Sequence, residues 1–405
     1  MIIRGRFAVG AILASAAVTS PALAAPQPSA HVDRLTLGFN VRAEHDTNMS
    51  GVSEAEARSR GVSPDDTIYT PNLTVGLNLP AGRQLIYLDG YAGYVYHDKN
   101  TIYDSERVSA NGGVKGRLGM CTYDLAGNYA RGLSSFEDIV LGPTIDNILE
   151  TKGVSLQATC ARKTGLGVTG QVSHEVAEND TTLLRPQDYE QTSYMGGISY
   201  SKPRLGTLTL FGQHVRTEYN HRTPVLGQTD GYESNTEGLT YDRRLGARIE
   251  GTVTVSYTSV DSLGANGPTA RSNFDGFTYS LAGTYRASTR LRFDGAFARE
   301  VTPSNRFGNS YDVGTRYSLK GSYDFGSRIT ANLGFEQRDV DSKGAQVFAG
   351  NLTNSKIKIV SGGVSYRMNR RINLSLDAAH EQRDANDARF EYDNDRVGVT
   401  AGVTY

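Results

Sequence analysis

The feature of this sequence that most constrains its fold is a strict alternation of apolar and polar residues over long segments. Residues 248–258 alternate in this way, and residues 312–325 and 397–405 repeat the pattern without a charge on the apolar parity. A period of two residues is typical of a β-strand with one apolar and one polar face. Similar runs recur around Leu73, Val108, Val154, Val168, Ile198, Tyr279, Phe293, Leu333, Val364 and Leu376.

Short polar connections join the alternating segments two by two, and longer polar connections lie between these pairs. The short connections recur about every 40 residues, which leaves room for two strands, one short turn and one longer loop in each interval. They lie at Pro80–Arg83, Gly119, Arg162–Gly165, Pro203–Gly206, Arg243–Gly246, Ser288–Arg290, Phe325–Arg328 and Asn369–Arg371. This asymmetry is typical of outer-membrane barrels, whose short turns face the periplasm. We therefore predict an all-β, antiparallel up-and-down transmembrane barrel of about 18 strands, with 16 as the alternative.

Other β architectures share part of this pattern. Soluble sandwiches also alternate apolar and polar residues. A β-propeller repeats at a similar interval, but each blade would need four short strands where this sequence has room for two long ones. In lipid an open sheet would leave unpaired backbone groups at its edges, so the first strand, near Leu35–Ala43, is expected to pair with the last.

Tyrosines recur a few residues before the short turns or the chain end, mostly on the apolar parity. This position is typical of the aromatic girdle at a membrane interface, although tyrosine is also common in ordinary strands. The girdle candidates are Tyr200, Tyr241, Tyr285, Tyr323, Tyr366 and Tyr405. An amphipathic last strand that ends on an aromatic residue also resembles the signal recognised by the bacterial barrel assembly machinery.

The first residues have the pattern of a secretory signal. Arg4 and Arg6 precede the apolar stretch 7–18, and Ala22-Leu23-Ala24 follows. The apolar stretch is shorter than the roughly 20 residues of a membrane-spanning helix. We expect residues 1–24 to be a cleaved signal peptide, 25–34 a short periplasmic segment and 35–405 the barrel, located in the outer membrane of a Gram-negative bacterium.

The two cysteines fall at the turn-side ends of neighbouring predicted strands. Cys121 follows the Gly119 turn, and Cys160 precedes the Arg162 turn. Each shares the parity of its strand's apolar residues, and an exported protein meets an oxidising compartment. We predict a disulfide between them, with two buried free thiols as the alternative.

The polar parity is expected to line the interior. A barrel of 16 to 18 strands is wide enough for an aqueous channel. The lumen candidates are Arg42, Tyr87, Asp89, Tyr91, Lys115, Arg117, Glu250, Asp294, Arg316 and Lys320. Either these residues contact solutes, with Tyr87 and Tyr91 stacking on a saccharide, or they only pair with one another and pack within the wall.

Residues 37–48, Leu-Gly-Phe-Asn-Val-Arg-Ala-Glu-His-Asp-Thr-Asn, resemble the opening of the putative β-barrel porin 2 family. In that family the first strand commonly leads into an acidic, Asn-containing loop, and here His45 and Thr47 interrupt that stretch. The hairpin periodicity of the remaining chain is similar as well. The resemblance implies an outer-membrane barrel, and members of the family are often associated with exopolysaccharide production and export.

Charge is distributed unevenly between the two kinds of connection. The short turns contain the bases Arg83, Arg162, Lys163, Arg204, Arg243, Arg244, Arg290, Arg328, Arg370 and Arg371. The long loops contain the acids Asp65, Asp66, Glu137, Asp138, Asp180, Asp384, Asp387 and Asp393. The bases either contact phospholipid headgroups or gather an anionic polymer at the periplasmic entrance.

These features predict a porin-like passage for polar solutes or saccharides, linked to exopolysaccharide export. The alternative is a non-conducting structural or adhesive surface barrel. We expect no enzyme, cofactor or metal site, because the sequence contains no common catalytic, phosphate-loop or zinc motif. The expected partners are outer-membrane lipid, lipopolysaccharide, the barrel assembly machinery and polysaccharide or its export machinery. A net charge of −1 gives no electrostatic case for nucleic acid.

Overall fold

The protein is described from a computed structural model. The structure describes residues 35–134, 147–162, 164–222, 230–263, 273–304, 309–343 and 352–405. The predicted signal peptide, the segment 25–34, Glu137, Asp138 and Lys163 lie outside these residues.

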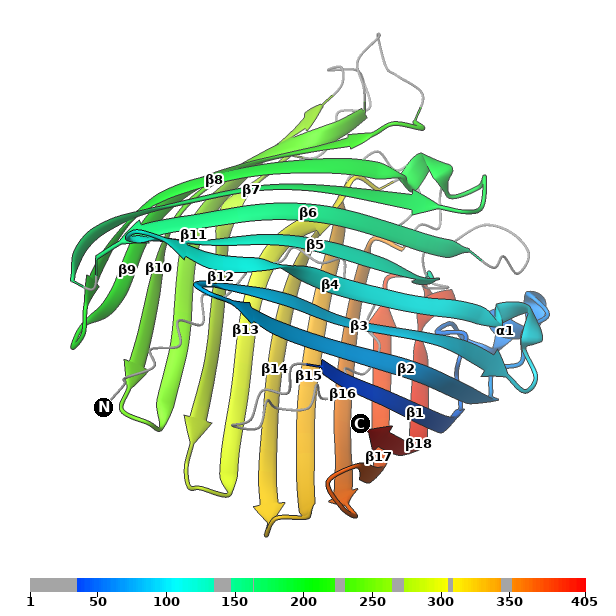
Figure 1. Cartoon of the computed structure of the whole chain (residues 1–405). Coiled ribbons are helices and arrows are strands. Elements are labelled where there is room, and N and C mark those ends of the chain that lie inside the picture. The colour runs from blue at the N-terminus through cyan, green and yellow to red at the C-terminus, as the bar shows by residue number, and fades with distance from the viewer. Residues whose placement is uncertain are drawn as a thin grey trace.

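Eighteen antiparallel strands form one closed sheet, which confirms the predicted fold class and strand number (Figure 1). The first nine are β1 (Leu35–Asp46), β2 (Asp66–Ala81), β3 (Gln84–His97), β4 (Ser105–Leu118), β5 (Cys121–Leu133), β6 (Ile148–Ala161), β7 (Gly165–Asn179), β8 (Tyr189–Lys202) and β9 (Gly206–Tyr219). The others are β10 (Asp230–Leu245), β11 (Ile249–Leu263), β12 (Phe274–Arg286), β13 (Leu291–Pro303), β14 (Tyr311–Phe325), β15 (Ile329–Lys343), β16 (Asn354–Arg367), β17 (Ile372–Ala385) and β18 (Tyr392–Thr404).

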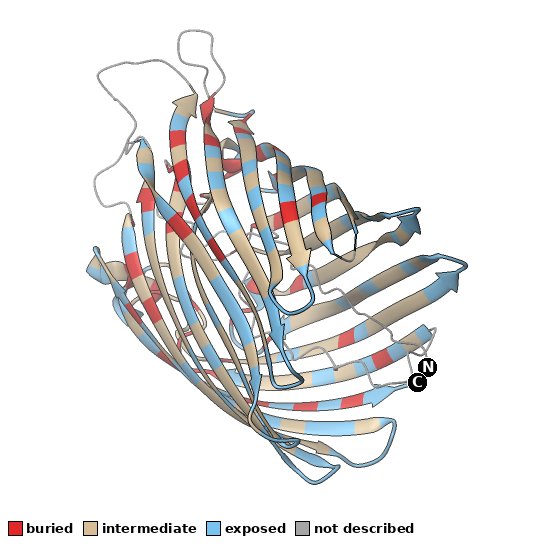
Figure 2. Cartoon of the chain, turned by 90° about the vertical axis from the view of Figure 1, so that its left-hand side faces the viewer, coloured by how far each residue is buried: buried red, intermediate tan, exposed pale blue. Residues whose placement is uncertain are grey.

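The sheet closes where the sequence predicts. β1 pairs with β2 on one side and with β18 on the other, in a register that places Gly38 opposite Thr404. This closure leaves no sheet edge at the chain ends, as lipid requires. Exposed and less exposed residues alternate along the strands, so each strand has an outward and an inward face (Figure 2).

The two ends of the barrel differ. One, which we call the turn end, carries the eight short connections, and these fall at the eight predicted turns. Gly82 and Gly119 each have a positive φ there, a conformation that glycine adopts without strain. The other, the loop end, carries the longer connections, with α1 (Glu54–Ser59) and the short helices η1 (Thr101–Tyr103), η3 (Arg185–Gln187) and η4 (Ala388–Phe390). None of the described helices is long and apolar enough to cross a membrane.

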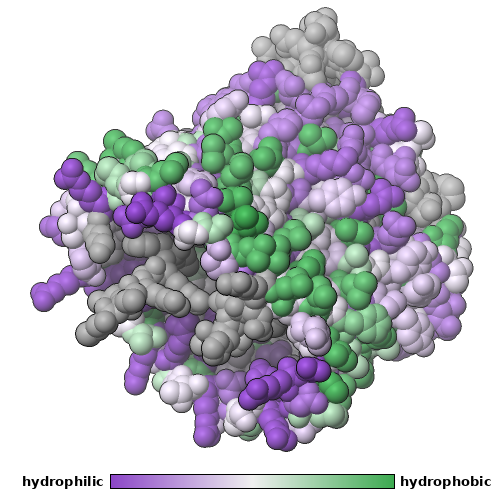
Figure 3. Space-filling view, in the orientation of Figure 1, coloured by the Kyte–Doolittle hydropathy of each residue, from purple (hydrophilic) through white to green (hydrophobic). Residues whose placement is uncertain are grey.

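Large apolar side chains gather on the outward face rather than in a central core. In Figure 3 they form a band across the molecule, with hydrophilic residues on both sides. Elsewhere around the barrel, Val255, Leu319, Leu333 and Val399 lie on the outward face, and each is at least half exposed. The buried apolar residues form small clusters, one of which packs α1 through Ala57 against Phe390 of η4.

Candidate functional site

The inward face of the strands is the wall of the lumen. The register keeps the two faces consistent around the whole sheet; for example, Asp89 lies opposite Asn111 and Asp294 opposite Lys320. All ten predicted lumen residues lie on this inward face: Arg42, Tyr87, Asp89, Tyr91, Lys115, Arg117, Glu250, Asp294, Arg316 and Lys320. The structure distributes them over separate parts of the wall and does not bring them together in one cluster.

The first charged part of the wall lies on β3, β4 and β5. The Tyr87 hydroxyl donates a hydrogen bond to Asp124 at 3.1 Å, and Lys115 Nζ lies 3.3 Å from the same carboxylate. Lys115 Nζ is also 4.5 Å from the centre of the Tyr87 ring. Arg107 approaches the Tyr91 ring at 5.7 Å. Both tyrosines therefore have cationic partners in the wall, and Tyr87 in particular is not an open stacking surface.

A second charged part lies on β13, β14 and β15. Asp294 accepts hydrogen bonds from Arg292 Nη2 and from the Thr284 hydroxyl, both at 2.6 Å. Arg316 donates to Glu336 at 3.0 Å, and Arg338 pairs with the same carboxylate. Cations and acids alternate here, so the local charge is nearly balanced.

A third charged part lies where the barrel closes. Arg42 on β1 pairs with Glu44 on the same strand and with Asp377 on β17. On the neighbouring strands, Arg396 donates to Glu381 at 2.7 Å. These pairs hold β17, β18 and β1 together on the inner side.

The wall formed by β6 to β12 is mostly neutral and is lined by hydroxyl and amide groups. Hydroxyl pairs span neighbouring strands there: Thr159 and Thr169 at 3.0 Å, Thr236 and Thr258 at 2.9 Å, Thr240 and Thr254 at 3.0 Å, and Ser256 and Thr278 at 2.9 Å. Its inward charges include Glu175 and Asp230 towards the loop end and Glu250, which pairs with Arg244 at 2.8 Å, near the turn end. The lumen thus has a neutral wall opposite a charged one.

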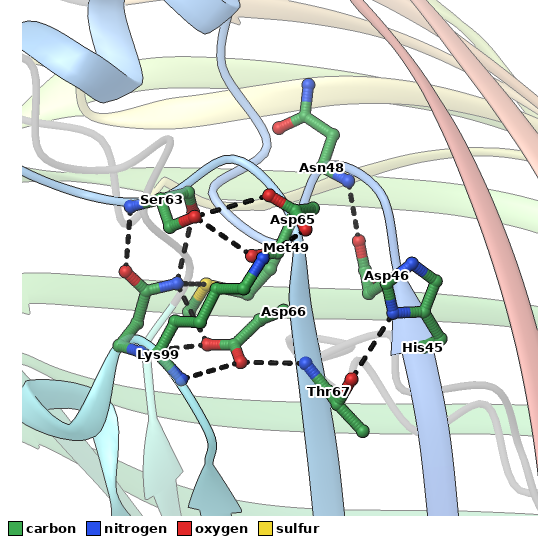
Figure 4. Close-up of polar contacts among 10 residues, drawn as sticks. His45, Asp46, Asn48, Met49, Ser63, Asp65, Asp66, Thr67 and Lys99 are labelled. Carbon is green, nitrogen blue, oxygen red and sulfur yellow. Dashed lines mark hydrogen bonds and ion pairs between the residues drawn. The ribbon is translucent and has the colours of Figure 1, made fainter.

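At the loop end the Asp66 carboxylate joins the β1–β2 connection to the β3–β4 connection (Figure 4). Its two oxygens accept hydrogen bonds from the backbone N–H groups of Thr67, Lys99 and Asn100 at 2.7 to 3.0 Å. The Asn100 side chain adds a bond at 2.8 Å. Asp66 is fully buried, so its charge is offset by these donors.

The residues at the end of β1, on which the family resemblance was based, also anchor a loop-end connection. The Asn48 backbone N–H donates to Asp46 at 2.9 Å and to Asn394 at 3.0 Å. The Asn48 side chain donates to the Val52 carbonyl at 2.9 Å. The Asp-x-Asn sequence therefore anchors the β1–β2 connection to the start of β18.

Cys121 and Cys160 are joined by a disulfide. They lie directly opposite each other on β5 and β6, on the outward face near the turn end. The cross-link therefore reinforces two strands that already pair, and it faces away from the lumen.

The six girdle candidates lie on the outward face towards the turn end. Several have local partners. Tyr241 donates to the Leu205 carbonyl at 2.6 Å, Tyr285 stacks on Phe293, and Arg371 lies 5.2 Å from the Tyr405 ring. Their role as a membrane-interface girdle remains a prediction.

Four histidines each precede an acid in the sequence, at His45-Asp46, His97-Asp98, His174-Glu175 and His380-Glu381. Adjacent residues of a strand point to opposite faces, so these neighbours are not dyads by themselves. His45 and His174 lie beside Thr67 and Thr192, respectively. His380 Nδ1 is 2.8 Å from Asp395, and both side chains are exposed on the outward face. Among the described residues, no group of three or more His, Cys, Asp or Glu side chains could hold a metal ion.

Several charged wall residues that were not among the candidates pair with a candidate or with one another. They are Glu44, Arg107, Asp124, Arg292, Glu336, Arg338, Asp377, Glu381 and Arg396. All lie on the polar parity of their strands. Extending the parity rule to every charged residue would have found them, but not their pairing.

A closed 18-stranded barrel with an apolar outer band and a polar interior has the architecture of an outer-membrane porin. The family model described as "Putative beta-barrel porin 2" matches residues 187–405, and the chain belongs to this family.

Solved porin structures resemble the barrel at low sequence identity. The structure of Pseudomonas aeruginosa OccK2 (OpdF) aligns with a TM-score of 0.47 at 13% identity, covering 91% of this chain and 98% of that one. A BenF-like porin from Pseudomonas fluorescens Pf-5 aligns with a TM-score of 0.45 at 10% identity, covering 92% and 99%. A search of curated proteins finds no match to this chain.

Proposed function

We propose that the barrel is a water-filled passage for polar solutes, saccharides among them. The observation that supports this is the two-sided lumen wall, which is neutral and hydroxyl-lined on β6 to β12 and charged with balanced signs elsewhere. The hydroxyls of the neutral wall bond to one another, so it presents few groups that would retain a polar solute strongly. The paired charges of the other wall favour water over apolar molecules.

Single-channel recording in planar bilayers tests this proposal. Purified, folded protein is expected to give discrete current steps, and vesicles that contain it should swell in iso-osmotic sugar solutions. A folded protein that gives neither current nor swelling would overturn the passage and favour the closed structural or adhesive barrel.

We further propose that the turn end faces the periplasm and receives an anionic polysaccharide during export. All the predicted turn bases within the described residues lie at this end, while the acids Asp65, Asp180 and Asp387 lie at the loop end. A basic entrance raises the local concentration of an anionic polymer. The family resemblance supports the link to exopolysaccharide.

Charge substitution tests the basic entrance. Arg243, Arg290 and Arg328 replaced together by Gln should reduce the flux of an anionic oligosaccharide more than that of a neutral one. The matched control replaces three cations near the loop end, Lys152, Arg216 and Lys358. An equal effect of both triple variants would contradict the proposal.

Deleting the gene in its source bacterium tests the biological role. Less exported polysaccharide, restored by the wild-type gene, is the expected result. Unchanged export would leave a general passage for small solutes. In either case we propose that the protein performs no reaction and that its partners are outer-membrane lipid and the barrel assembly machinery.

A further inference from the structure

The sheet separates between β12 and β13 towards the loop end. Pairing of these strands stops at Tyr279 and Arg299, although β12 begins at Phe274 and β13 continues to Pro303. β13 and β14 remain paired up to Pro303 and Tyr311. β14 in turn stays paired with β15 up to Tyr311 and Lys343. The loop-end parts of β13 and β14, which we call the hairpin end, therefore turn away from β12 while they remain joined to β15.

The hairpin end turns towards the lumen. Tyr311 and Val313 of β14 have outward parity, yet they are buried against Tyr232 of β10 and Val260 of β11, which have inward parity. The Tyr232 and Tyr311 rings lie 5.4 Å apart. An outward side chain can meet an inward side chain of these strands only if its hairpin lies on their lumen side.

Polar contacts fix the hairpin end to the next strands. The Tyr219 hydroxyl donates to the Ser310 carbonyl, and Arg222 Nη2 donates to the Asn309 carbonyl at 2.6 Å. Arg222 also donates to the Pro186 carbonyl at 2.7 Å, in the connection between β7 and β8. One guanidinium thus joins three loop-end connections.

The Arg222 guanidinium has further contacts besides these two carbonyl groups. Its guanidinium carbon lies 3.6 Å from the centre of the Tyr219 ring, and its Nη2 also donates to Gln187 at 2.5 Å. Burial lowers the pKa of Arg222 below its ordinary value. The buried Asp230 carboxylate, 3.3 Å from Arg222 Nη1, offsets part of this cost.

We propose that the inward-turned loop-end parts of β13 and β14, residues 301–304 and 309–313, form the constriction at the loop end of the passage, and that Arg222 holds them there. The hairpin end extends across the inner faces of β12, β11 and β10 to β9, so it occupies part of the loop-end opening. It therefore sets the upper size of the solutes that pass. This inference rests on the proposed passage.

Arg222→Ala is the first test. Its conductance is expected to exceed that of the wild type, and the size at which polyethylene glycols cease to enter the channel should shift to larger polymers. Arg216→Ala is the matched control, because Arg216 is also near the loop end of β9 but pairs on the outward face with Glu218 and Glu233. It should leave both measurements unchanged.

A reversible cross-link tests the same point independently of how well Arg222→Ala folds. Tyr232→Cys and Tyr311→Cys together provide two free thiols, since the native cysteines form a disulfide. Joining them with a short bis-methanethiosulfonate reagent should give wild-type conductance, and reduction should raise it. Reduced wild-type protein controls for loss of the native disulfide.

Two results would overturn the inference. A folded Arg222→Ala protein with the wild-type polymer limit, together with equal conductance of the linked and reduced cysteine variant, would show that the hairpin end restricts nothing while the passage itself stands. If the wild type and all variants carry no current, the proposed passage fails and the constriction fails with it.

Discussion

Arg42 on β1 and Asp377 on β17 form a two-bond ion pair across β18, although 335 positions separate them in the sequence. Arg42 Nη1 and Nη2 lie 2.7 and 2.6 Å from the two carboxylate oxygens. The pair crosses the strand at Gly398, where a Cβ atom would lie 2.5 Å from Arg42 Nη2. A glycine in β18 therefore leaves the space in which the first and seventeenth strands are joined.

This pair should stabilise the closure of the barrel. Arg42→Gln and Asp377→Asn are each expected to lower the free energy of unfolding, and the double variant should lose less than the sum of the two, with a coupling on the order of 1 kcal/mol. Denaturant unfolding in lipid vesicles measures the three values. Strictly additive losses would show that the pair contributes nothing to closure.

The assignment of inward and outward faces is tested by two adjacent residues of β14. Leu319 points outward, and Ser318 points inward. Leu319→Lys is expected to destabilise the folded barrel by about 2–4 kcal/mol if it lies near the middle of the bilayer, because the ammonium would be placed in hydrocarbon. Ser318→Lys should fold normally, since its new charge faces the lumen, and equal stability of the two variants would refute the assignment.

Most of the fold could be predicted from the sequence because a barrel wall obeys a local rule. A strand between lipid and water must alternate, and two strands with a short turn form a unit that is visible within about 40 residues. Closure followed from the cost of an open edge in lipid, and β1 does pair with β18.

For the candidate site, the sequence could predict only which residues face the lumen, not which of them contact one another. Parity placed Arg42 and Arg316 on the inner wall, but it could not identify Asp377 and Glu336 as their partners, since strand stagger and side-chain direction decide which charges meet. The inward turn of the β13–β14 end was invisible for a different reason. Tyr311 and Val313 keep the outward parity of their strand, and only the separation from β12 brings them inside.

The disulfide provides a prediction about stability and labelling. Unreduced protein should take up no maleimide, whereas Cys121→Ala should expose one reactive thiol at Cys160. Loss of the cross-link is expected to cost about 2–4 kcal/mol in denaturant, because it constrains the unfolded chain. Conductance should not change, since the disulfide faces outward; a changed conductance would mean that β5 and β6 depend on it for their shape.

The connection between β17 and β18 should be sensitive to acid. Asp387 accepts hydrogen bonds from Arg389 Nη2 at 2.7 Å and from its backbone N–H at 3.0 Å, and these bonds hold the pKa of Asp387 below its ordinary value. A carboxylate whose pKa is lowered by folding stabilises the folded form above its unfolded pKa, and this contribution disappears as the pH falls through the folded value. The Phe390 amide donates to the Asp387 carbonyl, so its protection factor, which is the exchange rate corrected for the intrinsic pH dependence, should fall in acid.

Asp387→Asn is expected to remove most of this acid step, because the amide carries no charge to lose. Asp384→Asn, three residues earlier, is the control, since Asp384 contacts Lys358 at 3.4 Å and takes no part in the turn. If both variants retain the wild-type profile, another group causes the acid sensitivity.

The charged part of the lumen wall should set ion selectivity, whereas the neutral wall should not. Arg316 and Lys320 lie on the inward face of β14, and Asp294 lies opposite Lys320 on β13. Removing the two cations by substitution with Gln leaves Asp294 and Glu336 less compensated, so the field in the lumen should favour cations. Reversal potentials in a salt gradient should shift towards cation selectivity in this variant and towards anion selectivity in Asp294→Asn. Thr258→Val on the neutral wall removes a hydroxyl without changing charge, and it should keep the wild-type reversal potential. Equal reversal potentials in all four proteins would show that ions do not pass along this wall.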